Sequence, residues 1–530
     1  MVFTPSPQQA AFLGWVKTGR GSAILQAVAG AGKTTTILEA LSLTGGGAAI
    51  MAYNKKIATE IKEKIEGRGI SWKDAQAGTC HSFGFGAYRK AFPGVTVDGN
   101  KVRDLIDAAI HAETDGSVYR TWKDAIGQMV GLAKQRALGI IGSVDNEDAW
   151  HGIIDHFDLL GDPPEEAVLP PPTRKLIHFA MKVLQESNAR TDTIDFDDMV
   201  YLPVLHRVRF WRYRWIFLDE AQDTNPARRA LVRAMLAPGG RLVAVGDPRQ
   251  AIYGFTGADA DSLDLIRRDF GAIEMPLTVS YRCPTTVVGF ARTWVDHIQA
   301  HPSAPAGSVS SIAYEDLFAR PDLKAGSAIL CRNTRPLVAL AFALIRRKIA
   351  AKVEGREIGN GLIAIVTRWK RIKTLPPLET KLTEWSEKQI ARATARGNGE
   401  LAQQVEDQLE TIKVFIDGCR EAGQDTVAAL ADSIQSLFGD EVTETLVLST
   451  IHKSKGREWE AVFWLDREHT CPSKWARQAW EQGQEDNLCY VAATRAKTHL
   501  IEITKPAEKK PDQKEKATTK DTTTAAKKEG

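Results

Sequence analysis

Short apolar runs that end in polar or glycine-rich residues recur along the chain, and helical patterns follow most of them. The first set covers residues 22–28 (SAILQAV), 48–53 (AAIMAY), 215–220 (WIFLDE) and 241–247 (RLVAVGD). Such runs are typical of parallel strands buried on both faces, in sheets that bind ligands at the carboxyl ends of their strands. A second set covers residues 327–332 (SAILCR), 444–450 (ETLVLST), 461–466 (AVFWLD) and 498–504 (THLIEIT). The pattern predicts an α/β fold with two cores, each built on a parallel sheet.

Each core is interrupted by a stretch of helical character. Residues 91–189 are broken by a proline cluster at 161–173 (GDPPEEAVLPPPT), whereas the charged residues of 356–440 are typical of a helical hairpin. We therefore expect a first lobe, a first insertion, a second lobe, a second insertion and a tail. The first lobe would comprise residues 1–90 and 190–278, with the first insertion at 91–189. The second lobe would comprise 279–355 and 441–505, with the second insertion at 356–440 and the tail at 506–530.

Composition narrows the class of protein without indicating a ligand. The chain has 530 residues, 43% hydrophobic and 25% charged, which is ordinary for a soluble globular protein. The net charge of +3 is carried by the lysine-rich tail, which lacks any aliphatic residue larger than alanine and is predicted to be disordered. The rest of the chain is electrically balanced, so bulk charge gives no argument for nucleic acid.

The cysteines and the apolar runs exclude two further classes. The six cysteines include no C-x-x-C pair, so we expect reduced, mostly buried thiols rather than a disulfide framework or a zinc module. No run approaches the ~18 apolar residues of a membrane span, and the N-terminus has no secretory signal pattern. We expect a protein without a membrane partner, cytoplasmic or wherever its substrate lies.

The clearest chemical motif is AVAGAGKT at residues 27–34. An apolar strand precedes it and a helix start follows, so backbone N–H groups of Ala29, Gly30, Ala31, Gly32 and Thr35 can hold phosphate. Lys33 would reach the β- and γ-phosphates, and Thr34 would bind Mg²⁺. Ala27 stands where the general pattern has its first glycine, and a structural glycine turn is the alternative interpretation.

Other polar residues follow the strands where such a site needs them. Asp219 can hold Mg²⁺ and Glu220 can activate the attacking water. Gln250 can sense a γ-phosphate, while Arg282 and Arg495 can deliver positive charge from the second lobe. Taken singly, such carboxylates are usually solvated, Gln250 is equally typical of a plain polar loop, and arginines are far commoner in salt bridges than in catalysis.

Several motifs follow AGAGKT in a fixed order. They are DEAQD (219–223), VGDPRQAIYGFTGAD (245–259), SYRCP (280–284), STIHKSKGREWE (449–460) and YVAATRAK (490–497). This set resembles the UvrD/Rep-type superfamily 1A DNA helicases, and AYNKKIA (52–58) and TCHSFG (79–84) are similar to the phage and F-box helicase branch. The resemblance implies two RecA-like P-loop NTPase lobes, and members of that family have alanine at the position of Ala27.

The resemblance also implies roles for individual residues. Gln8, in preference to Gln9, would read the adenine edge, Tyr281 would stack on the base, and Glu458 would contact the ribose. Carried over in the same way, Lys33, Glu220, Gln250, Arg282 and Arg495 are catalytic, and Thr34 and Asp219 hold Mg²⁺. The implied DNA contacts are stacking by Tyr53, Phe196 and Phe255, and backbone contacts by His81, Thr450 and His452.

Three departures from the family pattern bear on these expectations. Phe255 and Thr256 stand where the family usually has Trp and Arg, so a basic contact is missing. AYNKKIA replaces the usual T-F-T-N-K-A-A, which keeps an aromatic residue at Tyr53 but changes its neighbours. The second insertion is short, so the regulation known for large repair helicases is not implied.

Together these features predict an ATP- and Mg²⁺-dependent motor that moves along single-stranded DNA, 3′→5′ by resemblance, and unwinds duplexes at single-strand/double-strand junctions. We expect a monomer. Two alternatives remain open. One is a translocase that strips proteins with little unwinding, or a motor that prefers RNA, and the other is an ATP-responsive switch that binds nucleic acid.

Overall fold

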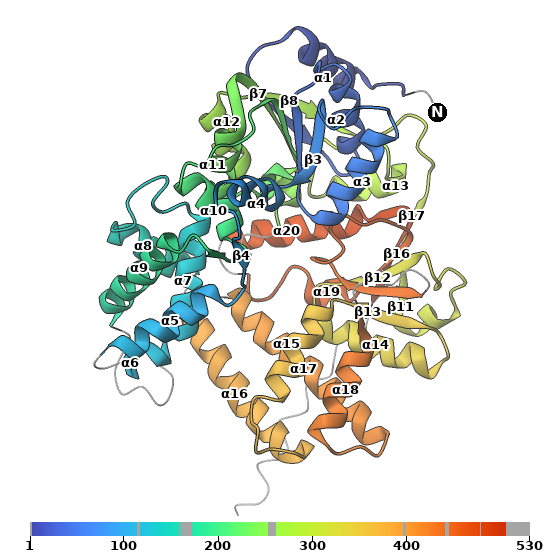
Figure 1. Cartoon of the computed structure of the whole chain (residues 1–530). Helices are drawn as coiled ribbons and strands as arrows, with labels where there is room; N and C mark the ends of the chain where they lie inside the picture. The colour runs from blue at the N-terminus through green and yellow to red at the C-terminus, as the bar shows by residue number, and fades with distance from the viewer. Residues whose placement is uncertain are drawn as a thin grey trace, which may run out of the picture.

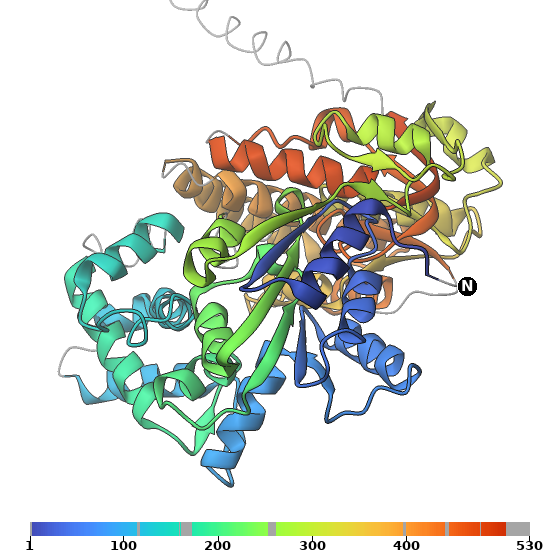
Figure 2. The same cartoon turned by 90° about the horizontal axis from the view of Figure 1, so that it is seen from above.

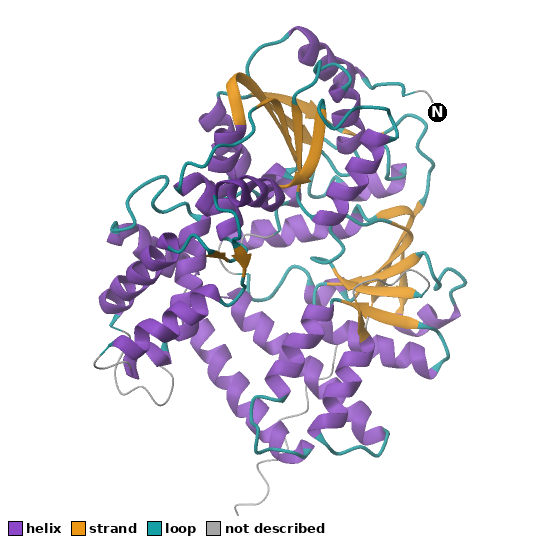
Figure 3. Cartoon of the chain, viewed as in Figure 1, coloured by secondary structure: helices purple, strands orange, loops and turns teal. Residues whose placement is uncertain are grey.

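The computed structural model describes residues 3–113, 117–157, 159–160, 172–252, 261–395, 399–439, 445–476 and 479–504. Two separate parallel sheets with helices packed around them form the body of the molecule (Figures 1 and 3). The predicted α/β class and both sets of strands are confirmed. Residues 161–171 of the proline cluster, Phe255 and the tail at 506–530 lie outside the described residues.

The first sheet has six strands in the order β3-β2-β6-β7-β1-β8, and all its pairings are parallel. Because the strands are parallel, the loops that follow β1, β6 and β7 meet at one edge. The strands are β1 (Ala23–Ala27), β2 (Ala48–Ala52), β3 (Ala75–Thr79), β6 (Tyr213–Leu218), β7 (Leu236–Gly246) and β8 (Ile273–Leu277).

Helices cover both faces of this sheet (Figure 2), which explains why its inner strands β1 and β2 are almost entirely apolar and buried. Ser6 caps the first helix in a capping box with Gln9, and Asn54 and Asn225 cap two others. The helices of the first lobe are α1 (Pro7–Thr18), α2 (Lys33–Leu41), α3 (Lys55–Glu66), α4 (Cys80–Ala91), α10 (Asp198–Leu205), α11 (Pro226–Met235) and α12 (Ser262–Phe270), with short turns η1 (Ala221–Asp223) and η2 (Pro248–Gln250).

The first insertion is a helical body beside the first sheet (Figure 2), and its apolar core also includes Tyr88 of α4 and Tyr201 of α10. The short strands β4 (Thr96–Val97) and β5 (Thr193–Ile194) pair with each other and join its two ends. Buried Asp198 of α10 binds Lys101 and Lys134 of the insertion, each at 2.7 Å, and so ties the insertion to the lobe. Its helices are α5 (Lys101–Ala112), α6 (Ser117–Thr121), α7 (Lys123–Gln135), α8 (Glu147–Phe157) and α9 (Thr173–Ala189).

The second sheet has seven strands in the order β11-β17-β16-β12-β15-β13-β14, again all parallel. Its strands are β11 (Ser308–Ala313), β12 (Ser327–Cys331), β13 (Ala351–Glu354), β14 (Phe438–Gly439), β15 (Leu446–Thr450), β16 (Trp459–Leu465) and β17 (Ala496–Thr504). The other elements of the lobe are the paired strands β9 (Val279–Ser280) and β10 (Gln299–Ala300), the turn η4 (Tyr314–Ala319), and helices α13 (Thr285–Ala291), α14 (Thr334–Arg346), α19 (Arg467–Thr470) and α20 (Ala479–Ala493). Helix α20 lies between the two lobes in Figure 1.

The second insertion shares one apolar core with the second lobe. Its helices are α15 (Arg356–Val366), α16 (Leu375–Ala395), α17 (Gly399–Glu421) and α18 (Val427–Leu437), and α16 with α17 forms the predicted helical hairpin. Asp407 of α17 accepts the backbone N–H groups of Thr334 and Arg335 at 2.7 and 3.0 Å, and so caps α14 of the lobe. This insertion is therefore packed as part of its lobe.

Two further sequence predictions concern the cysteines and the membrane. All six cysteines are buried and free, as expected, and the Sγ atoms of Cys471 and Cys489 lie 3.3 Å apart. Among the described residues, no helix has both the length and the apolar character that crossing a membrane requires.

Candidate nucleotide site and polynucleotide track

The phosphate loop is the turn between β1 and α2. Its glycines Gly30 and Gly32 have φ values of +72° and +75°, in the left-handed region that side chains other than glycine rarely adopt. A Cβ added at Gly30 would lie 2.5 Å from Cβ of Arg282, and the N–H of Tyr281 donates to the Gly30 carbonyl at 2.8 Å. The loop therefore needs glycine because the segment 280–282 packs directly against it.

Lys33 and Glu220 lie in contact where the loop meets the carboxyl end of β6. Lys33 Nζ is 2.7 Å from Glu220 Oε1, and the two side chains are only 14% and 16% exposed. Burial alone would raise the pKa of Glu220, but the charges of Lys33 and Lys455 overcome it and lower the pKa to about 2. Burial opposes the charge of Lys33 as well, yet Glu220 and Asp219 raise its pKa. Both groups are therefore held charged.

Asp219 and Thr34 offer oxygen ligands beside this pair. Asp219 is 6% exposed, and burial together with the nearby charge of Glu220 raises its pKa to about 6. Thr34 lies in the first turn of α2. The described residues hold no cluster of three or more His, Cys, Asp or Glu that could bind a metal by itself. One carboxylate and one hydroxyl do fit Mg²⁺, which takes most of its ligands from phosphate and water at such sites.

A chain of side-chain amides links the carboxylates along this edge. Gln222 Nε2 donates to Glu220 Oε2 at 2.6 Å, and Gln222 Oε1 accepts the N–H of Asp247 at 3.1 Å. Gln250 Nε2 donates to Asp247 Oδ2 at 2.6 Å, and Gln250 is only 4% exposed. The predicted γ-phosphate sensor is thereby connected to Glu220 through Asp247 and Gln222.

The two predicted arginines approach from the second lobe. Arg282 forms an ion pair with Glu458 and donates to the Thr494 carbonyl at 3.3 Å. Arg495 is 1% exposed and donates to the carbonyls of Val491 and Arg457 at 3.0 and 3.1 Å. Burial first, and the charge of Arg282 second, lower the pKa of Arg495 to about 10. A buried guanidinium bound only to neutral acceptors is well suited to receive an anion.

Sequence reasoning missed three residues that connect the lobes at this site. The Tyr490 hydroxyl of α20 accepts the Ala29 N–H at 2.9 Å, and Asn487 Nδ2 donates to the Ala251 carbonyl at 2.9 Å. Lys455 Nζ donates to Asp223 Oδ2 at 2.7 Å and to the Gln250 carbonyl at 2.6 Å. All three lie in or beside the recognised motifs, but spacing along the chain could not reveal their partners.

Both N-terminal glutamines lie close to the segment that contains Tyr281. Gln8 Oε1 accepts the Thr278 N–H at 2.8 Å, whereas Gln9 accepts from the Tyr281 hydroxyl at 3.0 Å and donates to Thr36 at 2.9 Å. Tyr281 is 42% exposed, and the His301 ring lies against it with the centroids 4.7 Å apart. Gln9 therefore holds Tyr281 to the phosphate loop, which the sequence did not indicate, and the role of Gln8 stays a prediction.

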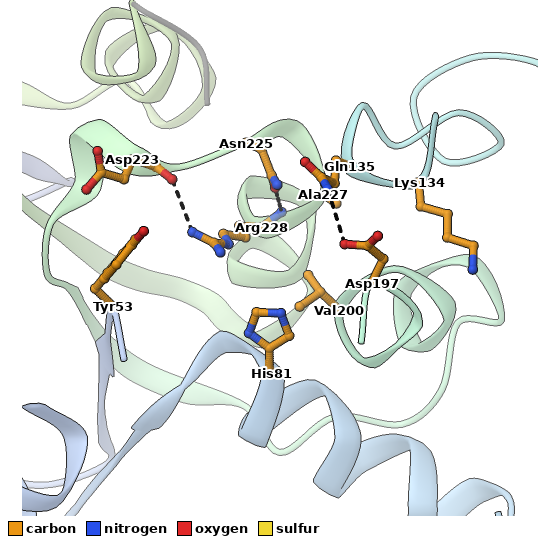
Figure 4. Close-up of a pocket in the computed structure, with 10 residues that line it drawn as sticks. All are labelled: Tyr53, His81, Lys134, Gln135, Asp197, Val200, Asp223, Asn225, Ala227 and Arg228. Atoms are coloured by element: carbon orange, nitrogen blue, oxygen red, sulfur yellow. Dashed lines mark hydrogen bonds between the residues drawn. The ribbon is translucent and has the colours of Figure 1, made fainter. Parts of the chain in front are cut away.

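Two of the predicted DNA residues line one cavity of about 250 Å³ between the first lobe and its insertion (Figure 4). Tyr53 follows β2 and His81 lies in the first turn of α4, and both side chains are drawn in Figure 4 with Arg228 between them. The Arg228 guanidinium is 5.9 Å from the Tyr53 ring centroid. Burial, with Arg228 second, lowers the pKa of His81 to about 4, so its ring is neutral at pH 7. The remaining lining residues are Lys134, Gln135, Asp197, Val200, Asp223, Asn225 and Ala227.

The other predicted DNA residues are spread over both lobes. Phe196 is 64% exposed directly before Asp197, which places an unburied ring beside that cavity. Thr450 is buried at the end of β15, where its hydroxyl accepts the Lys453 N–H at 3.4 Å. His452 lines a small second cavity with Arg332 and Glu485. The structure thus brings Tyr53 and His81 together but does not join Thr450 and His452 to them.

Comparison with known families matches nearly the whole of the described chain. A model described as the UvrD/REP helicase N-terminal domain matches residues 8–271, and one described as the UvrD-like helicase C-terminal domain matches residues 213–505. The chain belongs to the UvrD/REP helicase family. Membership confirms the resemblance drawn from the motifs, and with it two RecA-like lobes on parallel sheets.

Individual UvrD/REP relatives are distant in sequence. ATP-dependent DNA helicase Rep of Escherichia coli (strain K12) is 25% identical over 303 residues, which cover 53% of this chain and 41% of Rep. ATP-dependent DNA helicase UvrD2 of Mycobacterium bovis is 23% identical over 564 residues, covering 91% of this chain and 76% of UvrD2. ATP-dependent DNA helicase PcrA of Staphylococcus aureus (strain Mu50) is 23% identical, covering 52% of this chain and 38% of PcrA. The chain thus spans less than half the length of its Rep and PcrA relatives.

Proposed function

We propose that this chain is an ATP-dependent motor that moves along single-stranded DNA and unwinds duplexes at single-strand/double-strand junctions. The observation that carries the proposal is the composition of the nucleotide site. Lys33 and Glu220 come from the first lobe, while Arg282 and Arg495 reach the same site from the second lobe. A site divided in this way links hydrolysis to the relative position of the two lobes.

Lys33 and Glu220 neutralise each other in this structure. A γ-phosphate entering between them would take Lys33 as its own counter-charge and release Glu220 to orient and deprotonate the attacking water. Mg²⁺, held by Thr34 and Asp219, would supply Lewis-acid charge to the phosphate oxygens. Gln250 would contact the γ-phosphate and would be linked to Glu220 by the hydrogen bonds through Asp247 and Gln222.

Arg282 and Arg495 would stabilise the charge that develops during phosphoryl transfer. Arg282 would exchange its contact with Glu458 for a phosphate oxygen, which leaves Glu458 available to the ribose. Arg495 would not have to break an ion pair first, since its hydrogen-bond acceptors in the described part of the chain are neutral oxygens. Closure of the lobes and stabilisation of the transition state would therefore be one event.

The polynucleotide would run over the carboxyl-end edge of the sheets. Tyr53 and Phe196 offer aromatic faces for bases, and Arg228 beside Tyr53 offers charge for phosphate. Cycles of closure and opening would alternate the grip on successive bases. We propose 3′→5′ movement, which rests on family membership, and a monomeric motor acting wherever its DNA lies.

DNA-stimulated ATP hydrolysis by Lys33→Ala and Glu220→Gln tests the proposal. We expect both variants to lose at least about 10²-fold in kcat, because Lys33 would neutralise charge on the transferring phosphate and Glu220 would activate the attacking water. Glu220→Gln should retain nucleotide binding, since it removes charge but little volume. Wild-type turnover in both variants would exclude the motor and would favour an ATP-responsive switch.

A further inference from the structure

Two tryptophans are unusually exposed on the first lobe. Trp72 and Trp211 are 68% and 66% exposed, more than any other large hydrophobic side chain in the described ranges. Neither packs into an apolar core cluster. Exposed aromatic side chains that gather on one surface commonly mark an interaction site.

The two tryptophans belong to neighbouring segments at the amino ends of β3 and β6. Trp72 lies three residues before β3 and Trp211 two residues before β6. The turn at 45–47 lies between the segments, because Arg214 Nη2 donates to the Gly45 and Gly46 carbonyls at 2.6 and 3.1 Å. On the other side, the Ala48 N–H donates to the Asp74 carbonyl at 2.8 Å. We call residues 72–73 and 207–214 the amino-edge surface.

The amino-edge surface is strongly basic. Residues 199–218 contain Arg207, Arg209, Arg212 and Arg214 but no aspartate or glutamate, and all four arginines are exposed. Lys73 Nζ lies 5.9 Å from the Trp72 ring centroid and adds a fifth cation. Asp74, which directly follows Lys73, contributes one negative charge. The charge of nearby Glu39 is neutralised by its ion pair with Arg68. The surface therefore keeps a net positive charge beside two aromatic faces.

Two of these arginines also hold the backbone of the surface in place. Arg212 Nη1 donates to the Leu236 carbonyl at 2.9 Å, and Arg214 is anchored to the 45–47 turn. The Tyr213 hydroxyl donates to Gln76 Oε1 at 2.6 Å, which ties the Trp211 segment to β3. The two tryptophans are thus presented from an ordered backbone, so little conformational freedom is lost when they bind a ligand.

We propose that the amino-edge surface binds single-stranded nucleic acid, with bases stacked on Trp72 and Trp211 and phosphates held by the arginines beside them. Aromatic faces interleaved with cations are the combination that binds single strands without sequence preference. The parallel sheet places this surface at the edge opposite the phosphate loop and Tyr53. The bound stretch is therefore distinct from the one in the proposed track.

A binding measurement with the track already filled tests this inference without requiring ATP hydrolysis. Full-length protein is given one molar equivalent of a short unlabelled single-stranded oligonucleotide to fill the track, and a second, fluorescein-labelled strand is titrated while anisotropy is recorded. We expect Trp72→Ala with Trp211→Ala, and separately Arg209→Glu, to weaken binding of the labelled strand at least about tenfold, within the range typical of lost base stacking. Matched controls are Ile345→Ala and Arg371→Glu, which alter exposed side chains of the second lobe and its insertion.

The outcomes separate this inference from the proposed function. DNA-stimulated hydrolysis on the short oligonucleotide should stay unchanged in the amino-edge variants, which also shows that they fold. If the labelled strand binds wild type and the amino-edge variants equally, the inference is wrong. If wild type binds no second strand, the surface belongs to a protein partner and the inference is likewise wrong. Loss of hydrolysis in Lys33→Ala bears only on the motor.

The source of the second strand is resolved with two substrates. This part of the test rests on the proposed function. A forked duplex supplies a displaced 5′ strand, whereas a duplex with only a long 3′ tail supplies the distal part of the strand in the track. A displaced-strand contact predicts that the double tryptophan variant loses the extra affinity for the fork alone. A contact with the tracked strand predicts that the variant loses affinity for the long-tailed duplex alone. If the variant binds each substrate as tightly as wild type does, the inference is contradicted.

Discussion

Lys455 of the second lobe and Asp223 of the first form an ion pair across the two lobes, with Nζ 2.7 Å from Oδ2 and side chains only 7% and 2% exposed. The same ammonium donates to the backbone carbonyl of Gln250, the predicted γ-phosphate sensor. Asp223 ends the turn that begins just after Glu220. One side chain of the second lobe therefore contacts two turns at the carboxyl-end edge of the first sheet.

Breaking this pair should uncouple the lobes. We expect Lys455→Met to lower DNA-stimulated kcat and to destabilise the protein by about 3–5 kcal/mol, because it leaves a buried carboxylate without its partner. Burial already raises the pKa of Asp223 against the opposing charge of Lys455, so removal of Lys455 should raise that pKa further. Steady-state ATP hydrolysis and denaturant unfolding measure the two effects.

The double variant Lys455→Met with Asp223→Asn is the matched control. Removing both charges should restore much of the stability but not kcat, since the link to Gln250 is still absent. If the single variant matches wild type in both stability and hydrolysis, the ion pair has no coupling role.

The Tyr490 hydroxyl should contribute specifically to nucleotide binding. Tyr490→Phe leaves the Ala29 N–H of the phosphate loop without its acceptor, at a cost of about 1 kcal/mol. We expect a rise in KM for ATP of roughly fivefold with kcat less affected. Tyr201→Phe is the control, because it removes a buried hydroxyl bonded to the Leu138 carbonyl in the first insertion. An equal change in KM in both variants would argue against a role at the site.

Arg282 and Arg495 should both be needed for turnover, and Arg495, which is only 1% exposed, should contribute to stability as well. Replacing either by alanine is expected to lower kcat about 10³-fold, the lower range for arginines that stabilise phosphoryl transfer. Arg495→Lys should rescue little, since the planar fork is lost. Single-turnover ATP hydrolysis at saturating DNA measures this loss, and Arg457→Ala, a change at a neighbouring arginine, is the control. A loss confined to KM would assign these residues to binding alone.

Asp197 gives the protein a pH-dependent stability term. Burial first, and the charge of Asp195 second, raise its pKa to about 6 from an ordinary value of 3.8. For an acid shifted upward, the stabilising contribution is complete below about pH 4 and is lost as pH rises through 6. Asp197→Asn should therefore stabilise the protein at pH 7 by at most ~3 kcal/mol, with little effect at pH 4. Urea unfolding of wild type and variant at the two pH values checks the sign, and an Asn variant less stable at pH 7 would contradict it.

The sequence could predict the elements whose signal is local. The strands around residues 22–28 and 461–466 and the glycine turn before Lys33 depend on neighbouring residues, and the structure contains each of them. Contacts between distant segments could not be predicted in that way. Lys455 and Asp223 are separated by 232 residues, and a lysine within STIHKSKGREWE gives no sign of its partner.

The helical insertions and the glutamines show the same limit. The charged pattern of 381–416 predicted a helical hairpin, but not that Asp407 caps a helix of the second lobe and that one apolar core serves both. Two adjacent glutamines are indistinguishable by composition, and only the fold turns Gln9 toward Tyr281 while Gln8 faces Thr278. The assigned roles of the site residues stay predictions until these variants are measured.

ATP bound between the two lobes is proposed to drive movement along single-stranded DNA. Strand separation of matched duplexes with either a 3′ or a 5′ single-stranded tail, with and without streptavidin on the tail, tests it most directly. We predict ATP-dependent unwinding of the 3′-tailed duplex by wild type, none of the 5′-tailed duplex, and none of either by Lys33→Ala. Streptavidin displacement without strand separation would instead identify a translocase that strips proteins. ATP hydrolysis with neither displacement nor unwinding on any tail would contradict the claim.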